Sequence, residues 1–306
     1  MNAGWRIVDC TNLTGSIRYQ RGQIIVSSEE NGLDVAVPLA QVAVVLIGVQ
    51  ASISGAVITK LSEYDIALLV CDWRDVPIAG AIPWRQHTRI GIRHRSQAEL
   101  SLPRKKRAWA SIVQAKITGQ AHTLHLLNRP RSEELTSLIK NVRSGDPDNM
   151  EARAARKYWQ IISAETKFSR LPGSETIGWN SALDYGYTLL RGYGIRAVTS
   201  AGLSGALGVF HRGRGNAFAL VDDLMEPFRG MVDAFVFSRL SNDEALTKEA
   251  KHYLAASLNS AFDSSGKSLS TVFNEFAQQY GLYVEGEVES LVVPKWKGSL
   301  HASEGI

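Results

Sequence analysis

The first 80 residues alternate short apolar segments with turn residues, a pattern typical of a small β-rich domain. Five segments rich in β-branched residues are separated by turn signals that contain Asn, Gly or Glu. In order they read WRIVDC, SIRYQ, QIIV, LDVAVPL and VAVVLIG. Between residues 52 and 64 the apolar side chains recur at helical spacing, and another apolar strand, IALLVCD, follows. The pattern therefore predicts a β-rich N-terminal domain over residues 1–80, with one helix packed on its strands.

From residue 81 to residue 306 the apolar spacing is mainly that of helices. One helix is predicted from Ala108 onward, and another is predicted to begin at the pair Asp146-Pro147, as N-cap and first-turn residues. The tail from Val292, which contains Trp296, lacks this spacing, and we expect it to be loose or docked on a partner. The predicted fold class is α+β, with an all-α C-terminal domain over residues 81–306.

Basic residues are concentrated at the start of this second part. The chain has 34 Lys and Arg against 30 Asp and Glu, a net charge of +4 that permits a nucleic-acid partner without requiring one. Arg85, Arg89 and Arg93 recur every four residues, so on a helix they would share one face and repel one another. A DNA phosphate would relieve that repulsion. The alternative is a solvated helix surface, and both interpretations remain open at this stage.

Several classes of protein are disfavoured by the sequence. Cys10 and Cys71 belong to no Cys/His spacing, which argues against zinc ribbons and disulfide scaffolds. The most apolar run, Val42 to Val49, is far shorter than the roughly 20 residues that cross a bilayer. The N-terminus also lacks the features of a secretory signal. We therefore expect a soluble cytoplasmic protein that does not bind a membrane.

The stretch from Ser204 to Asp233 has the composition of a metal site. His211 precedes a glycine-spaced loop with two arginines. Further along the chain, three carboxylates lie within five residues of one another. Carboxylates favour hard divalent cations, and one imidazole extends the preference from Mg²⁺ toward Mn²⁺. The carboxylates are Asp222, Asp223 and Glu226. The alternative is structural: Asp223 could be an N-cap, with Glu226 completing a capping box.

Glu151 is a further candidate ligand from a distant segment. On a helix it shares a face with Ala154, Ala155 and Tyr158, so its carboxylate would point inward, where a bare charge needs a partner or a metal ion. It could equally be a first-turn glutamate that the helix dipole favours. Arg212 and Arg214, beside His211, could hold a phosphate that does not react.

Four blocks in fixed order resemble a known family. They are GDPDNMEARAARKYW, WNSALDYGYTLL, GLSGALGVFH and LVDDLMEPFR. The chain is similar to the CRISPR-associated spacer-acquisition integrases, the metal-dependent DNA endonuclease subunit of the adaptation complex, and most similar to members from type II systems. The resemblance implies that Glu151, His211 and Glu226 bind Mg²⁺ or Mn²⁺. It also implies that Asp223 is an auxiliary ligand or a hydrogen-bond acceptor, although Asp222 leaves open which aspartate faces the ion.

The resemblance implies partners and a reaction as well. Members of this family form homodimers, which here would use residues 1–80, and assemble with a small second protein on double-stranded prespacer DNA. They join the 3′-hydroxyl of that DNA to a phosphodiester of the CRISPR repeat, and in type II systems the effector nuclease takes part. A non-enzymatic DNA-binding scaffold is the competing interpretation, and a general metal-dependent nuclease is a third. In each case Arg85, Arg89, Arg93, Arg212 and Arg214 are the predicted DNA contacts.

Overall fold

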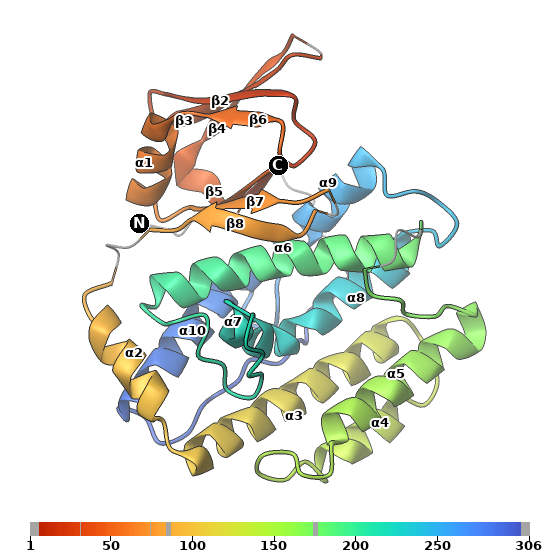
Figure 1. The fold of residues 1–306 in the computed structure, drawn as a ribbon. Helices are drawn as coiled ribbons and strands as arrows, with labels where there is room; N and C mark the ends of the chain where they lie inside the picture. Colours follow the sequence, from red (N-terminus) through yellow and green to blue (C-terminus); the bar gives the residue numbers. More distant parts are fainter. Residues whose placement is uncertain (1–5, 31, 74, 84–86, 174–176, 301–306) are drawn as a thin grey trace.

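The computed structural model describes residues 6–30, 32–73, 75–83, 87–173 and 177–300. Strands occupy the first part of the chain and helices the second, which confirms the predicted α+β fold (Figure 1). The strands form two four-stranded sheets, with orders β1-β5-β7-β8 and β4-β3-β2-β6. Their bounds are β1 Arg6–Cys10, β2 Gly15–Gln20, β3 Gln23–Ser28, β4 Asp34–Pro38, β5 Val42–Ile47, β6 Ala51–Ile53, β7 Ala67–Cys71 and β8 Pro77–Ala81.

Strand β5 is buried on both faces because its sheet lies between two cores. Val45 and Ile47 pack in the core with the second sheet and helix α1 (Gly55–Glu63). Val44 and Leu46 belong to the core formed with the helices, since neighbouring side chains of a strand project to opposite faces. Strands β1, β5 and β7 are parallel, and near-continuous apolar strands are typical of parallel sheets covered on both faces. Helix α6 (Trp179–Ser200) provides the second cover (Figure 1).

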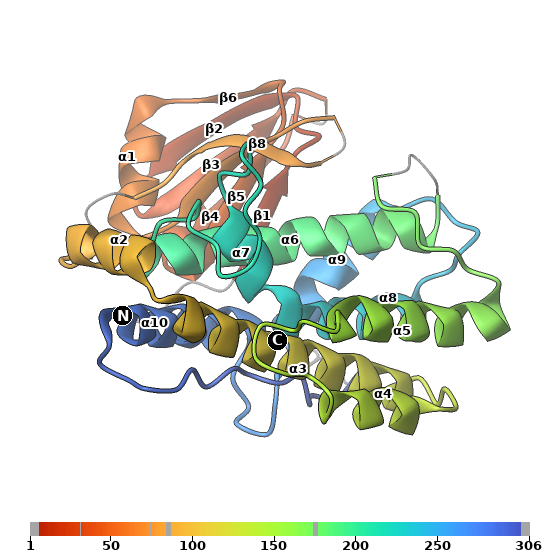
Figure 2. The same cartoon turned by 60° about the horizontal axis from the view of Figure 1, so that its bottom comes forward.

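Helix α3 (Leu102–Leu126) runs through the helical part and packs against α4, α5, α8 and η2 (Figure 2). The described residues form further helical elements besides α1, α3 and α6. They are η1 Leu39–Gln41, α2 Ile90–Glu99, α4 Ser132–Ile139, α5 Met150–Thr166, α7 Ala219–Leu224, η2 Glu226–Phe228, α8 Arg229–Arg239, α9 Lys248–Ser257 and α10 Leu269–Glu285. No helix in the described ranges is both long and apolar enough to cross a membrane.

The start of α5 differs from the prediction in a way that positions Glu151. The helix begins at Met150 rather than at Asp146-Pro147, because Asn149 adopts a left-handed conformation with φ of 51°. Asp146 lies outside the helix but still accepts hydrogen bonds from backbone N–H groups of its first turn. Its two carboxylate oxygens accept the backbone N–H groups of Met150 and Glu151, at 2.8 and 2.9 Å. The first turn that carries Glu151 is therefore held in place by a buried carboxylate.

The C-terminal tail is part of the core, which corrects the prediction of a loose or partner-bound segment. Trp296 is fully buried, and its ring centroid lies 5.6 Å from that of His122 and 5.7 Å from that of Phe262. Its Cβ also packs close to Gly119 of α3. The tail has no helical spacing because residues 291–299 have no regular secondary structure and bury isolated side chains such as Trp296.

Both cysteines are buried and free. Burial raises the pKa of the Cys10 thiol and of the Cys71 thiol to about 12. At neutral pH both therefore remain protonated, and a protonated thiol is a poor nucleophile and a poor metal ligand.

Candidate metal centre

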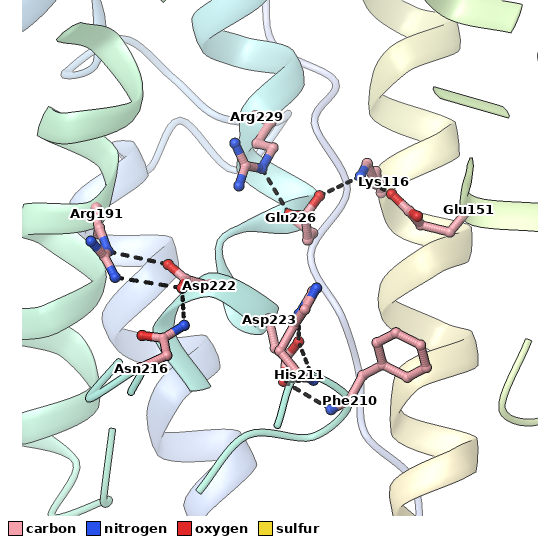
Figure 3. A network of polar contacts seen from close by, with 10 residues as sticks. All are labelled: Lys116, Glu151, Arg191, Phe210, His211, Asn216, Asp222, Asp223, Glu226 and Arg229. Atoms are coloured by element: carbon pink, nitrogen blue, oxygen red, sulfur yellow. Dashed lines mark hydrogen bonds and ion pairs between the residues drawn. The ribbon is translucent and has the colours of Figure 1, made fainter. Parts of the chain in front are cut away.

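Segments that are far apart in the sequence bring the three predicted metal ligands together around helix α3 (Figure 3). Glu151 lies in the first turn of α5, the turn that Asp146 holds. Glu226 opens η2, directly after α7. His211 lies in the loop between α6 and α7. The packing of α3 against both α5 and η2 brings the two glutamates close to each other.

Lys116 of α3 lies between the carboxylates of Glu151 and Glu226 (Figure 3). Its ammonium nitrogen is 2.5 Å from Glu226 Oε2 and also binds Glu151 Oε1. Burial by itself lowers the pKa of Lys116, but the charges of Glu226 and Glu151 outweigh burial and raise this pKa above its ordinary value. A positive charge therefore lies at the point where the two carboxylates converge.

Glu226 is a buried carboxylate whose two oxygens each have a cationic partner. Its Oε1 accepts a hydrogen bond of 2.8 Å from Arg229 Nε. Its Oε2 is buried and lies 2.5 Å from the Lys116 ammonium, which is its partner in the described structure. Burial by itself raises the pKa of Glu226, but Arg229 and Lys116 lower it to about 2, so the group is ionised at neutral pH. An ionised carboxylate fits a hard divalent cation, which would take the place of the Lys116 ammonium at Oε2.

His211 is oriented by Asp223. The imidazole Nδ1 lies 2.5 Å from Asp223 Oδ1, and half of the His211 side chain is exposed whereas Asp223 is fully buried. The hydrogen bond to Asp223 raises the pKa of His211 above its ordinary value, against the opposing effect of burial. Because Nδ1 donates to the carboxylate, Nε2 is the ring nitrogen left to bind an ion. This is the usual arrangement of a histidine that ligates a metal.

The loop that carries His211 closes tightly over Asp223. The carboxylate also accepts the backbone N–H of Phe210 at 2.9 Å. Gly208 permits this approach, because a Cβ at that position would lie 2.5 Å from the carbonyl oxygen of His211 and 2.9 Å from Asp223 Oδ2. A side chain at position 208 would therefore displace the loop from the carboxylate that orients the imidazole.

These contacts agree with the second of the two roles predicted for Asp223, that of a hydrogen-bond acceptor, while a role as auxiliary ligand stays a prediction. Both of its oxygens bind the His211 loop, Oδ1 at the imidazole and Oδ2 at the backbone N–H of Phe210. Asp222 has other partners: Arg191 Nε lies 3.1 Å from one oxygen, and the Asn216 amide donates to the other at 2.7 Å. Neither aspartate has an oxygen that is aimed at the Glu226 carboxylate (Figure 3).

Replacing Asp223 with asparagine is expected to weaken Mn²⁺ binding by about 10–100-fold, because the imidazole loses the carboxylate that fixes its orientation. Isothermal titration calorimetry with MnCl₂ measures this change. The matched control is Asp222→Asn, which alters the neighbouring carboxylate but leaves the His211 contact intact. A larger loss of affinity in Asp222→Asn than in Asp223→Asn would contradict the assignment.

Glu226 lies next to each of the other two predicted ligands, but the three do not share one site. His211 and Glu226 line one cavity of ≈ 400 Å³, which Arg191 and Arg229 also line. Glu151 meets Glu226 through Lys116, outside the set of residues that lines this cavity. Within the described ranges, no group of three His, Cys, Asp or Glu side chains is already arranged to hold a metal ion. Binding an ion between all three ligands therefore requires Lys116 to leave its position.

The predicted basic stripe is only partly available to DNA. Arg93 is buried, and its Nε lies 3.2 Å from an oxygen of Glu285, which is buried as well. Its guanidinium also donates to the carbonyl of Ala201 and to Gln278. The anion that relieves repulsion in this stripe is thus Glu285 of α10. The prediction that Arg93 contacts DNA is wrong, because this buried side chain instead joins α2 to α10.

The other predicted DNA contacts differ in exposure. Arg89, the N-cap residue of α2, is half exposed and binds Glu285 at 3.1 Å. Arg85 lies outside the described residues. Arg212 and Arg214 are exposed in the loop after His211, so both remain candidates for phosphate contacts.

Lys116 and Arg229 are the site residues that sequence reasoning missed. The signal for Lys116 was present: it lies four residues from Ile112 and from Gln120, and both of these are buried. A lysine on the buried side of a helix needs a charged partner. Arg229 closes the block LVDDLMEPFR three residues after Glu226, a spacing that brings two side chains together on a helical turn.

Comparisons with known proteins identify the family of this chain. The family described as "CRISPR associated protein Cas1" matches residues 11–261. The chain is 36% identical over 234 residues to the CRISPR-associated endonuclease Cas1 of Neisseria meningitidis serogroup C (strain 8013). This match covers 76% of the present chain and 75% of the Neisseria protein. It is 30% identical over 257 residues to the protein of the same name from Korarchaeum cryptofilum (strain OPF8), covering 74% and 75% of the two chains.

Solved structures share the fold at low sequence identity. A casposase bound to an integration product superimposes with a TM-score of 0.76 at 18% identity. The superposition covers 95% of this chain and 94% of the casposase chain. A Cas1 protein from Thermotoga maritima has a TM-score of 0.74 at 17% identity, with 95% and 100% covered. The match over residues 11–261, the two relatives and the shared fold together show that this chain belongs to the Cas1 family of CRISPR-associated proteins.

Proposed function

We propose that this protein is a divalent-metal-dependent DNA endonuclease and integrase that inserts prespacer DNA into CRISPR repeats. The observation that carries the proposal is the pair Glu151 and Glu226, whose carboxylates converge on one positive charge beside His211. A site of two carboxylates and one imidazole suits Mg²⁺ or Mn²⁺. Two carboxylates roughly cancel the charge of such an ion, which allows an anionic DNA substrate to approach.

In this proposal Glu151, Glu226 and Nε2 of His211 hold the ion. When bound, the ion offsets charge on the phosphodiester transition state and lowers the pKa of the attacking hydroxyl. Asp223 keeps the imidazole in the tautomer and orientation that ligation needs. Arg229 keeps Glu226 ionised, and Arg212 and Arg214 hold phosphates that do not react.

The reaction exchanges one phosphodiester bond for another. The 3′-hydroxyl oxygen of the prespacer attacks a phosphorus atom of the repeat, and the bond from that phosphorus to the 3′-oxygen of the repeat strand breaks. The attacking hydroxyl loses its proton and the departing oxygen gains one, so the exchange needs no oxidant and no external energy source. Endonuclease activity is the same displacement with water as the attacking group.

We also propose the partners that this activity needs. A Cas6-RT-Cas1–Cas2 complex contains a chain with this fold, at a TM-score of 0.72 and 18% identity, which covers 96% of this chain and 36% of its own. That complex supports a small second subunit of the Cas2 kind, and the casposase bound to an integration product supports a DNA partner. A homodimer formed through residues 1–80, participation of a type II effector nuclease and a cytoplasmic location remain predictions.

Removing the metal is the direct test. The protein is mixed with its small second subunit, a labelled prespacer duplex and a plasmid that carries CRISPR repeats, and joined product is measured on a gel. We expect joining with MgCl₂ or MnCl₂, and none when EDTA removes the ion. DNA retained without joining in every condition would support the scaffold alternative. Equal cleavage of repeat and shuffled DNA, with no joining, would support a general nuclease.

A further inference from the structure

Asp233 of α8 is a buried carboxylate that joins three helices. It is 2% exposed and accepts hydrogen bonds from two tyrosine hydroxyls. Tyr158 of α5 donates to Oδ2 at 3.0 Å, and Tyr187 of α6 donates to Oδ1 at 2.5 Å. Each oxygen therefore binds a different helix, and the two hydrogen bonds fix the positions of α5 and α6 relative to α8.

The packing of these helices permits the contact. Gly186 precedes Tyr187 in α6, and Val232 precedes Asp233 in α8. A Cβ on Gly186 would lie only 2.5 Å from Val232 Cγ1, so a side chain at position 186 would push the two helices apart. Tyr158 is fully buried in the same core as Val232. The three polar groups therefore meet inside the packed core, where their positions are fixed by the side chains around them.

The charge of Asp233 lowers the stability of the fold. Burial raises the pKa of Asp233 to about 6, although the hydrogen bonds from Tyr187 and Tyr158 oppose this effect. At pH 7.5 the carboxylate is therefore ionised, and both oxygens act as acceptors. Among the described residues it has no ion-pair partner, because the nearby Arg229 pairs with Glu226. A buried charge without a cation is less favourable than an apolar side chain of similar size, so stability does not account for this residue.

The two tyrosines connect this carboxylate to the two predicted glutamate ligands. Tyr158 lies seven residues after Glu151 in α5, which is about two helical turns. The guanidinium carbon of Arg229 lies over the ring of Tyr187, 4.7 Å from its centroid. Arg229 in turn donates to Glu226 Oε1 at 2.8 Å. A displacement of either tyrosine would therefore change the separation of the two glutamate carboxylates.

We propose that Asp233 is a positioning residue that sets the separation of Glu151 and Glu226 for a divalent ion. It acts through Tyr158 and Tyr187, whose hydroxyls it binds. Mg²⁺ requires near-ideal octahedral geometry with short bonds, whereas Ca²⁺ accepts longer bonds and a more flexible set of ligands. A fixed separation of the two carboxylates therefore favours Mg²⁺ over Ca²⁺. This inference rests on the metal centre of the proposed function.

Tyr158→Phe tests this role, because it removes one hydroxyl and keeps the buried ring. Binding of MgCl₂ and, separately, of CaCl₂ to the full chain is measured by isothermal titration calorimetry. We expect the Mg²⁺ affinity to fall about 10-fold, the lower end of the 10–100-fold cost of losing a group that orients a ligand. The Ca²⁺ affinity is expected to fall less. Asp233→Asn leaves one acceptor oxygen for two hydroxyls, and it is expected to lower the ratio of Mg²⁺ to Ca²⁺ affinity as well.

The matched control is Tyr185→Phe. Tyr185 is another buried tyrosine, and its hydroxyl also donates to a carboxylate, Asp9 Oδ2, at 2.6 Å. Its replacement is expected to lower the melting temperature about as much as Tyr158→Phe does, because each variant loses one hydrogen bond to a carboxylate. The ratio of Mg²⁺ to Ca²⁺ affinity is expected to stay unchanged in Tyr185→Phe.

The outcomes separate positioning from a general loss of stability. The proposal is overturned if Tyr158→Phe and Asp233→Asn keep the affinity ratio of the unmodified chain. It is also overturned if Tyr185→Phe lowers that ratio as much as Tyr158→Phe does, because the ratio would then follow stability alone. If the unmodified chain bound neither ion, the metal centre of the proposed function would be wrong, and this inference would fail with it.

Discussion

His211→Ala is expected to reduce strand transfer by more than about 100-fold while fold and DNA affinity are retained. Loss of a group that merely orients a ligand costs about 10–100-fold, so loss of the ligand itself costs more. The side chain is half exposed, and its main described contact is Asp223, so its removal leaves the core packed. Joined product is measured in the presence of MnCl₂, alongside the melting temperature and the affinity for prespacer DNA.

The matched control for this variant is His94→Ala, which removes an exposed histidine of α2. It is expected to join DNA as the unmodified chain does. Glu151→Gln tests the opposite side of the site and is expected to match His211→Ala. If strand transfer persisted in both variants, the metal site would be wrong, and the scaffold interpretation would gain.

Lys116→Met is expected to make the protein less stable without metal and to strengthen its binding of Mn²⁺. Removing one partner of a buried ion pair costs roughly 3–5 kcal/mol, and we expect the lower part of this range because Arg229 still binds Glu226. With the ammonium gone, the ion no longer competes with an internal cation for the two carboxylates. At 100 times its dissociation constant, Mn²⁺ would restore about 2.7 kcal/mol. Melting temperatures with MnCl₂ and with EDTA measure the difference.

Lys251→Met provides the comparison for Lys116→Met. Lys251 is similarly buried and forms a 2.8 Å ion pair with Asp75, and it forms no ion pair with Glu151 or Glu226 in the described structure. Its replacement is expected to lower the melting temperature without any recovery on addition of MnCl₂. If Lys116→Met gained no more from Mn²⁺ than the unmodified chain does, the ammonium would not occupy the position of the ion.

Local patterns predicted most of the elements because they depend on neighbouring residues. The β-branched segments before residue 80 are strands, and the helical spacing after it belongs to helices. The short strands β6 and β8 were not predicted, since three to five residues of mixed burial give no clear periodicity. The start of α5 was also misplaced, because Asp146 caps the helix from four residues away rather than from the N-cap position.

The sequence by itself determined the fold class and, through its four blocks, the three predicted ligands Glu151, His211 and Glu226, of which the last two line one cavity. Only the tertiary structure decided what each charge is paired with. Arg93 pairs with Glu285, which lies 192 residues further along the chain, and Lys116 pairs with Glu226. Helix packing forms both pairs, and no short-range sequence pattern predicts them. Burial then selects these pairs, since an unpaired charge inside a protein is costly. The same packing stacks the rings of Phe210 and Trp109 close to His211, beside three basic side chains that form no ion pair within the described ranges.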